Sequence, residues 1–205
     1  MLQPRVPGRW ATNWAELMLN EALLFLLAVL LQPFAVLLLL RFYMQLLRIS
    51  LRNPVGEFVL VLTDFIVLRA RRVLPSVGKA DTASLVLALV AEALYLAGVQ
   101  WVQGVHPSGA VWIGFPLWAA VKLFNISIYL LMAAVFMQAI LSWINPHTPM
   151  ASILASVTRP FLLPLRRHIP LAGNIDLAPM VLLIICQLIV IVPLGWLERM
   201  VTGIL

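Results

Sequence analysis

A stretch of the chain occurs twice, with the two copies 95 positions apart and no gap between matched residues. The first copy covers residues 46–81 and the second covers residues 141–176. The identical positions include Pro, Thr, Arg, Gly and Asp, so an apolar composition alone does not explain them. A period of this length indicates a duplicated supersecondary unit. The identical pairs are Leu46/Leu141, Ile49/Ile144, Pro54/Pro149, Thr63/Thr158, Leu68/Leu163, Arg71/Arg166, Arg72/Arg167, Pro75/Pro170, Gly78/Gly173 and Asp81/Asp176.

The composition predicts that this unit lies in a membrane. Apolar residues make up 63% of the chain, charged residues make up 11%, and the mean hydropathy is +1.02. A soluble domain averages about 45–50% apolar and about 25% charged residues. We therefore interpret the net charge of +6 as a topology signal rather than as nucleic-acid binding. The single cysteine, Cys186, excludes an intramolecular disulfide and a Cys-rich metal site.

The apolar runs predict an all-α polytopic fold with four transmembrane helices arranged as two repeats. A span needs about 20 apolar residues, and four runs meet this length. The first contains Pro33, which we expect to kink it. The predicted spans are 21–47, 83–102, 117–144 and 179–197, and the predicted units are an N-terminal tail 1–21, a first repeat 22–103, an extracytoplasmic turn 104–116 and a second repeat 117–205.

Each repeat also contains an apolar run that is too short to cross a membrane. In the first repeat this run is 58–68, and Asn53 followed by Pro54 marks the start of its helix. Such a run predicts an interfacial or a re-entrant helix, and both alternatives stay open. In the second repeat the equivalent helix, 150–165, contains Pro160 and Pro164, so we expect it to be broken.

The positive charges predict the orientation of the chain. The loop 48–82 carries six Lys and Arg residues, the loop 145–178 carries three, the turn 103–116 carries none and the N-terminal tail carries two. The positive-inside rule therefore puts both repeat loops in the cytoplasm and both termini outside. Because each repeat contains two spans, both repeats enter the membrane in the same direction, as repeats related by an axis along the membrane normal do.

The matched arginines of the two loops are the leading candidates for binding. They are Arg71, Arg72, Arg166 and Arg167, and they follow the short helices. A guanidinium forms bidentate hydrogen bonds with phosphate or carboxylate, so these residues are candidates to bind lipid phosphate, a nucleotide phosphate or an acidic partner. Alternatively, they only anchor the topology and favour a helix C-terminus.

A matched turn follows the double arginines. Glycine supplies a positive φ in such a turn, and an aspartate caps the helix that follows. The other interpretation is that the turn presents its aspartate to a partner or an ion, and an Asp–Arg pair across the loop is compatible with the capping role. The matched structural positions of the loops are Pro54, Thr63, Pro75, Gly78, Asp81, Pro149, Thr158, Pro170, Gly173 and Asp176.

Glu92 is the polar residue whose position is most unusual. It lies near the middle of the second predicted span, and the matched position of the other repeat is Gln187. A carboxylate at this depth is costly and faces a bundle interior or a water path. It therefore serves either an ion or proton site in a small transporter, where it would meet Gln187 near the axis, or a hydrogen bond that holds helices together.

Nothing in the pattern predicts an enzyme, a cofactor or a metal site. The three histidines, His106, His147 and His168, show no tight ligand spacing, and none matches a histidine of the other copy. The loop serines and threonines have no nucleophile–base arrangement. The sequence contains no Gly-rich phosphate loop and no carboxylate pair.

The motifs of the second copy resemble the signature of the YggT family. They comprise residues 141–149, 158–170 and 173–179, and the resemblance extends over nearly the whole chain as two tandem copies. The first copy departs from the signature at Arg48, Asp64, Arg69 and Ser84. The resemblance implies a small integral protein of the cell inner membrane of a Gram-negative bacterium. Members of the family have been linked to osmotic-stress tolerance, to the cell-division gene neighbourhood and, in plastids, to cytochrome assembly and nucleoid organisation.

Two functional hypotheses follow from these observations. In the first, the chain is a membrane interaction or assembly factor whose basic loops engage the lipid bilayer, anionic lipid headgroups or a membrane-protein partner. In the second, it is a small channel or transporter for an ion or osmolyte that uses Glu92. A homo-oligomer is compatible with both hypotheses, and neither involves nucleic acid.

The predicted orientation is testable by cysteine accessibility. Single cysteines at Ser76 and Ala172 should be labelled only from the cytoplasm, and one at Ala110 only from the opposite side, because the positive loops stay inside. Labelling in intact cells and in inverted vesicles measures this. Cytoplasmic labelling of position 110 would overturn the orientation.

Overall fold

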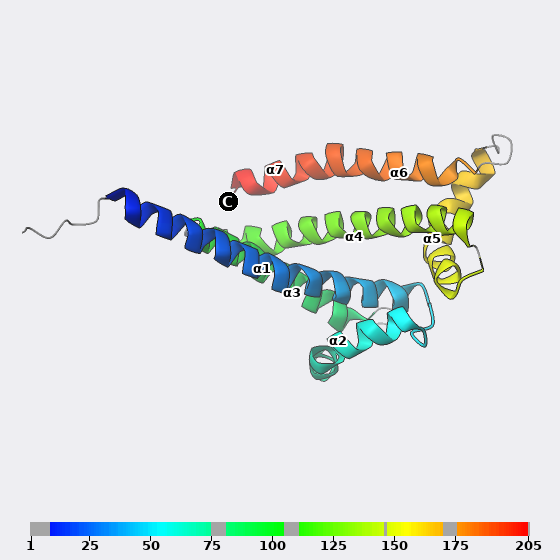
Figure 1. Ribbon diagram of the computed structural model, residues 1–205, viewed down its shortest axis with the longest axis horizontal. Coiled ribbons are helices and arrows are strands. Elements are labelled where there is room, and N and C mark those ends of the chain that lie inside the picture. Colours follow the sequence, from blue (N-terminus) through cyan, green and yellow to red (C-terminus); the bar gives the residue numbers. More distant parts are fainter. Residues whose placement is uncertain (1–8, 75–80, 105–110, 146, 170–175, 205) are drawn as a thin grey trace, which may run out of the picture.

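The computed structural model describes residues 9–74, 81–104, 111–145, 147–169 and 176–204, and within these residues every element is a helix (Figure 1). A π-helical turn, η1, interrupts the last long helix. The elements are α1 (Arg9–Leu46), α2 (Pro54–Ala70), α3 (Thr82–Val102), α4 (Val111–Ile144), α5 (Pro149–His168), α6 (Ala178–Ile189), η1 (Val190–Leu194) and α7 (Gly195–Ile204).

Four helical segments are long and apolar enough to cross a membrane, which confirms the predicted all-α, four-span fold. They are Glu16–Leu46, Thr82–Val102, Gly114–Ile144 and Ala178–Gly203. α1 begins well before the predicted start of the first span and continues through Pro33. The fourth segment accommodates Pro193 in η1, where the wider π turn absorbs the missing backbone donor.

The helices pack in an order that follows the chain. α1 makes its most extensive contact with α3, α3 also contacts α4, and α4 contacts α6, η1 and α7. The short helices α2 and α5 lie toward the same end of the bundle, away from the start of α1 and the end of α7 (Figure 1). α1 and α4 therefore both run toward that end. A relation of the two repeats by an axis along the membrane normal stays a prediction.

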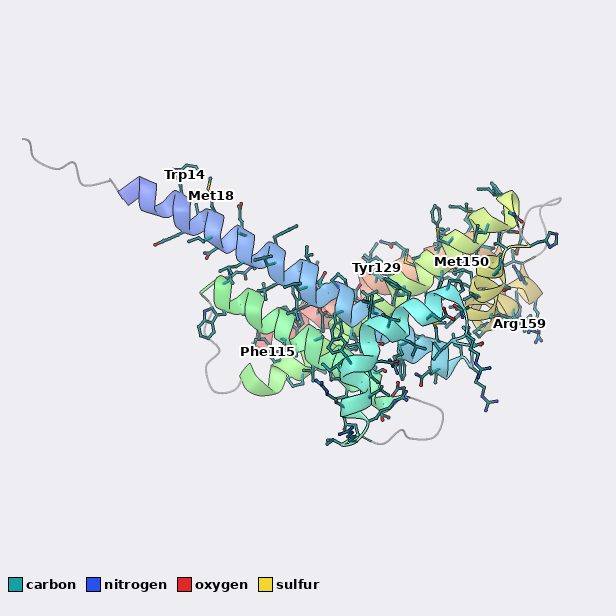
Figure 2. All side chains as sticks on the ribbon, turned by 60° about the horizontal axis from the view of Figure 1, so that its bottom comes forward. Trp14, Met18, Phe115, Tyr129, Met150 and Arg159 are labelled. Carbon is teal, nitrogen blue, oxygen red and sulfur yellow. The ribbon has the colours of Figure 1, made fainter. Side chains whose placement is uncertain are left out.

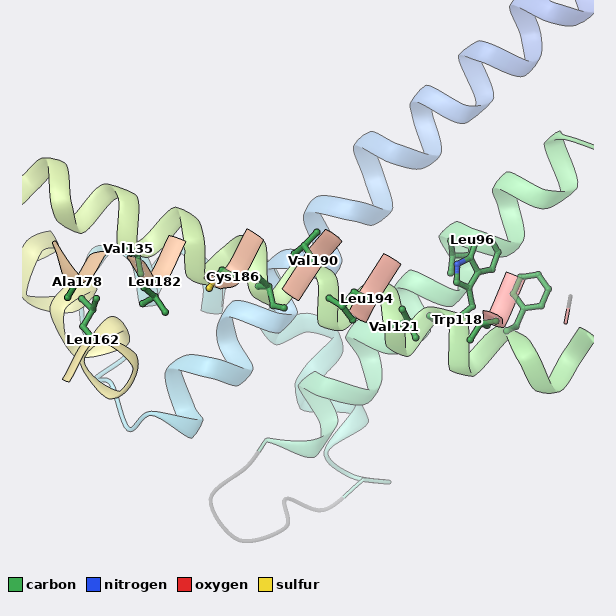
Figure 3. Close-up of a cluster of buried hydrophobic side chains, with 14 residues drawn as sticks. Leu96, Trp118, Val121, Val135, Leu162, Ala178, Leu182, Cys186, Val190 and Leu194 are labelled. Carbon is green, nitrogen blue, oxygen red and sulfur yellow. The ribbon is translucent and has the colours of Figure 1, made fainter. Parts of the chain in front are cut away.

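Small residues let the spans approach closely. Ala83, Ala88 and Ala91 are buried on α3, and a Cβ atom added to Gly98 would lie 2.9 Å from a methyl group of Leu27 on α1. Lipid offers no hydrophobic driving force between helices, so close packing of this kind stabilises the bundle. In the second half, the buried side chains Leu182, Cys186, Val190 and Leu194 of α6 and η1 form a row that lies alongside α4 (Figure 3).

The outer surface of the bundle is apolar, as a lipid-facing surface must be. Large apolar side chains project along the helices, including Trp14 and Met18 of α1 and Tyr129 of α4 (Figure 2). α2 belongs to this surface, because Val61 and Phe65 are 76% and 60% exposed on its outer side. Its inner face is buried through Gly56, Val59, Thr63 and Val67, whose spacing follows one side of a helix.

The two short helices begin as the sequence predicts. Asn53 Oδ1 accepts a hydrogen bond from the Gly56 N–H at 2.9 Å, and Thr148 Oγ1 accepts one from the Ala151 N–H at 3.2 Å. Pro54 and Pro149 occupy the first helical positions, where the lack of an N–H costs nothing.

The expected break in the second short helix is wrong. α5 is continuous over 20 residues although it contains Pro160 and Pro164. These prolines are four residues apart and exposed, so both lie on the outer side of α5. The backbone carbonyls that lose a partner, those of Ser156 and Pro160, therefore belong to exposed residues and can bind solvent or headgroups.

α1 ends in a Schellman motif with an unusual residue in it. The Ile49 N–H donates to the Met44 carbonyl at 2.8 Å, and the Arg48 N–H donates to the Gln45 carbonyl at 3.0 Å. In this motif the residue at the position of Arg48 adopts a left-handed conformation and is usually glycine. Arg48 has a φ of 55°, a left-handed backbone conformation that glycine would adopt with less strain than arginine.

Gly56 is predicted to be essential for the entry into α2. A Cβ atom at this position would lie 2.4 Å from the Leu51 carbonyl oxygen, so Gly56→Ala should lower the free energy of unfolding by about 1–3 kcal/mol through overpacking. Gly203→Ala is the matched control, because no atom lies within 4 Å of that Cβ position. Thermal unfolding in detergent measures both variants. Equal stability of the two would contradict the predicted clash.

Candidate functional site

The carboxylate of Asp81 is the centre of a buried polar network in the first repeat. Its side chain has no exposed surface, and it lies directly before α3. Arg71, after α2, donates from Nη2 to Asp81 Oδ2 at 2.7 Å and from Nε to Oδ1 at 3.3 Å. The Ser84 hydroxyl donates to Oδ2 at 2.6 Å, and Gln45 Nε2 of α1 donates to the same oxygen at 3.2 Å. The carboxylate thus joins three helices.

Arg41 completes this network from within α1. It is 2% exposed, and its Nε lies 3.6 Å from Asp81 Oδ2. Its Nη1 donates to the Thr63 hydroxyl and to Asp64 Oδ1, both at 2.7 Å. The Thr63 hydroxyl in turn donates to the Val59 carbonyl at 2.6 Å, one turn back along α2. A buried guanidinium needs such partners because its desolvation costs several kcal/mol.

The second repeat reproduces the Arg–Asp pair in a more exposed form. Arg166 donates from Nε and Nη2 to Asp176 Oδ2, each at 2.8 Å, and the two side chains are 47% and 32% exposed. Asp176 Oδ1 also accepts a hydrogen bond from the Ala178 N–H at 3.0 Å. The buried Thr158, which matches Thr63, hydrogen-bonds to the Gln138 side chain instead of to an arginine.

These contacts decide between the roles expected for the matched aspartates. The prediction that Asp81 caps the next span is wrong, because its side chain makes no capping hydrogen bond with α3 and binds Arg71 and Ser84 instead. The compatible Asp–Arg pair across the loop is observed in both repeats. Asp176 combines this pair with a hydrogen bond to the first backbone N–H of α6.

The contact between Arg71 and Asp81 also determines the charge state of both residues in the first repeat. Burial acts to raise the pKa of Asp81, but the hydrogen bonds from Arg71 and Ser84 and the charges of Arg71 and Arg41 together lower that pKa below its ordinary value. The hydrogen bond with Asp81 raises the pKa of Arg71. Both groups are therefore charged at neutral pH.

The two arginines of each matched pair differ in their surroundings. Arg71 and Arg166 are held by aspartates, whereas Arg72 and Arg167 are exposed and have no hydrogen bond or ion pair through their side chains with the described part of the chain. The first arginine of each pair is thus engaged by an aspartate, and the second has its whole guanidinium free for another molecule within the described part of the chain. Pro75, Gly78, Pro170 and Gly173, which form the predicted turn, lie outside the described residues.

The intramembrane polar residues do not meet as expected. Glu92 is 1% exposed on α3, whereas Gln187 is exposed on α6, so the expected meeting of the two near an axis is wrong. Glu92 Oε2 has no hydrogen-bond partner in the described part of the chain, and the charge of Lys122 on α4 acts on this carboxylate. Lys122 Nζ lies 2.5 Å from Glu198 Oε1, so three spans contribute an ionisable group to one region.

Sequence reasoning missed the basic residues inside the spans. Arg41 and Lys122 each lie within an apolar run that is long enough to span a membrane. A charged residue inside such a run is costly unless it is paired or functional, so its position was a signal that the sequence offered. The partners of both residues come from other helices, at sequence separations that no local pattern reveals.

Comparison with known proteins identifies the family. The CCB3/YggT family model matches residues 20–102 and again residues 117–197. The chain belongs to the CCB3/YggT family. It is 30% identical over 170 residues to the uncharacterized protein YggT of Escherichia coli, which covers 82% of this chain and 87% of that protein. It is 28% identical over 173 residues to the uncharacterized protein PA0392 of Pseudomonas aeruginosa, with 83% and 87% covered. No solved structure matches the chain.

The same substitution in the two repeats should have unequal effects. Asp81→Asn should lower the free energy of unfolding by about 3 kcal/mol because it leaves Arg41 and Arg71 without their shared buried carboxylate. Asp176→Asn should cost less than about 1 kcal/mol, since that pair is partly exposed. Thermal unfolding of both variants in detergent measures this, and equal losses would contradict the assignment.

The pH dependence gives a second readout of the same carboxylate. Because the folded pKa of Asp81 is lower than its unfolded value of about 3.9, its contribution to stability is present above that value and is lost as pH falls through the folded pKa. The parent should therefore lose more stability below about pH 4 than Asp81→Asn does.

Proposed function

We propose that this protein is a non-catalytic interaction and membrane-organisation factor of the bacterial inner membrane, with its basic face in contact with anionic headgroups or an acidic membrane partner. The observation that carries the proposal is the unequal use of the matched arginines. Arg71 and Arg166 hold the loops together, and Arg72 and Arg167 remain exposed beside them, once in each repeat. A role in osmotic stress belongs to the same proposal.

The orientation of the charges supports this function. α2 and α5 lie toward one end of the bundle, and the positive-inside rule makes that end cytoplasmic and both termini extracytoplasmic. The cytoplasmic leaflet carries the negative surface potential that attracts basic segments near a membrane. The exposed apolar side of α2 brings its arginines to the level of the headgroups.

Absence of catalysis is part of the proposal. In the described ranges, no group of three or more His, Cys, Asp or Glu side chains is arranged to hold a metal ion. The Arg–Asp pairs join loops to helices, so the carboxylates of Asp81 and Asp176 are engaged in structural contacts.

The exposed arginines are predicted to determine binding to anionic lipid. Replacing Arg72 and Arg167 with Gln should weaken binding to micelles that contain anionic phospholipid about tenfold to thirtyfold, because each surface arginine contributes about 1 kcal/mol. Equilibrium binding at two salt concentrations measures this, and the salt dependence should fall with the affinity.

The charge-matched control replaces Arg9 and Arg199, which belong to the opposite end of the bundle. It should bind like the parent. If binding is unchanged when Arg71, Arg72, Arg166 and Arg167 are all replaced with Gln, the proposal is wrong. Crosslinking in membranes, with identification of the captured protein, distinguishes a protein partner from lipid alone.

A second candidate function is transport of a small ion or osmolyte. It is favoured by Glu92, which has a buried oxygen without a hydrogen bond in the described chain, and by the Lys122–Glu198 pair, whose lysine charge acts on Glu92. Ionisable groups of this kind within spans mark ion and proton pathways.

Transport predicts a specific loss on substitution of this carboxylate. Glu92→Gln should abolish flux in reconstituted vesicles, whereas Glu57→Gln, at the exposed start of α2, should leave it intact. Flux that is absent from the parent, or equal in Glu92→Gln, would eliminate this candidate.

A further inference from the structure

The two halves of the chain form a pocket of about 670 Å³ between them. One wall is the segment that links α1 to α2, including Arg48 and Ser50, and the other wall is α5, including Ser152 and Arg159. Its volume lies within the range of about 300–1,000 Å³ that is usual for ligand sites. Because each wall comes from a different repeat, the pocket lies between the two copies of the repeated unit.

The charge of the pocket favours an anion. The wall that links α1 to α2 contributes the guanidinium of Arg48, and α5 contributes that of Arg159. Among the described residues that line the space, none carries a carboxylate. Neither guanidinium has a hydrogen bond or an ion pair with the described part of the chain, and the Arg159 side chain projects outward from α5 (Figure 2). Two cations on opposite walls match a group with several anionic oxygens, such as phosphate, which guanidinium binds in a bidentate manner.

The remaining lining is both polar and apolar. Ser152 and Ser156 lie one helical turn apart on α5, and Arg159 continues the same side of the helix. Ile49, Ile153 and Leu163 line the pocket as well. An anionic group that carries an apolar portion would contact both kinds of surface, and basic pockets between membrane helices bind lipid headgroups in this way.

The backbone at Arg48 is a separate observation that points to the same site. Its φ of 55° is a conformation in which glycine is unstrained and arginine is not. The Schellman hydrogen bonds around it use only backbone atoms, so they need no side chain at this position. Strained residues of this kind concentrate at ligand sites, and the side chain of this one lines the pocket.

We infer that the pocket binds a single phosphate-bearing anion between Arg48 and Arg159. Its source is either the headgroup of an anionic phospholipid or a soluble phosphate. The inference goes beyond the proposed function, because it uses none of the matched arginines and specifies one defined site instead of a diffuse basic face.

The test counts and measures bound ligand on the full chain in a neutral detergent. Three probes are compared by native mass spectrometry and equilibrium titration: phosphatidylglycerol, phosphatidylcholine with the same acyl chains, and inorganic phosphate. The parent should bind one phosphatidylglycerol tightly, and phosphatidylcholine should bind at least about fivefold more weakly. Inorganic phosphate that competes with the lipid would support recognition of the phosphate group itself.

The variants are chosen so that unfolding does not explain a loss of binding. Arg48→Gly removes the guanidinium but puts the preferred residue in the Schellman motif, so its thermal unfolding temperature should equal or exceed that of the parent. Arg48→Gly and Arg159→Gln should each weaken binding about fivefold, as expected for one surface guanidinium. Arg52→Gln is the matched control, since Arg52 is an exposed arginine of the same loop that does not line the pocket.

Each result has a defined meaning. If only inorganic phosphate binds, and the two pocket variants weaken it, the site is supported and its ligand is soluble. Equal affinity of the parent for the three probes, or unchanged affinity in both Arg48→Gly and Arg159→Gln, would overturn the inference.

Discussion

The burial of Arg41 is the constraint on which the first half of the molecule depends. A guanidinium that is 2% exposed inside a helix bundle must be compensated, because desolvating it costs several kcal/mol. Its partners are Thr63 and Asp64 of α2 and Asp81 before α3. Because these three residues belong to the elements that follow α1 in the chain, one side chain sets the position of the loop helix and of the next span. Arg71 then binds both oxygens of Asp81 and closes the loop.

The second half has the same framework with different charges. Gln138 replaces an arginine as the partner of the buried threonine, and the position of Asp64 is taken by Arg159. At this position the first repeat has an aspartate, which pairs with Arg41, whereas the second repeat has the guanidinium of Arg159 at the pocket between the halves. Duplication thus produced two similar scaffolds, and their divergence in charge makes the junction between them basic. The pocket and the exposed Arg72 and Arg167 are separate consequences of this arrangement.

Much of the fold was predictable from local properties of the chain. Span length follows from apolar run length, and the starts of α2 and α5 follow from Asn53–Pro54 and from Thr148–Pro149, because caps act over a few residues. Reasoning from single residues was less successful. Pro160 and Pro164 do not break α5, since both lie on its exposed side. Asp81 does not cap α3, because Arg71 and Ser84 bind its carboxylate more closely than any backbone donor does.

The sequence by itself determined the number of spans, the duplication and the side of the membrane that its charges favour. Only the tertiary structure decided which polar residues face inward and which arginines are free. The physical reason is that lipid and protein interior are both apolar, so a membrane helix has no hydrophobic stripe that tells its two sides apart. Glu92 and Gln187 occupy matched positions, yet one is buried and the other faces outward. The two arginines of each loop are adjacent in sequence, but only the first contacts an aspartate ten residues further along the chain. This contact gives the first arginine a structural role and leaves the second free to bind another molecule.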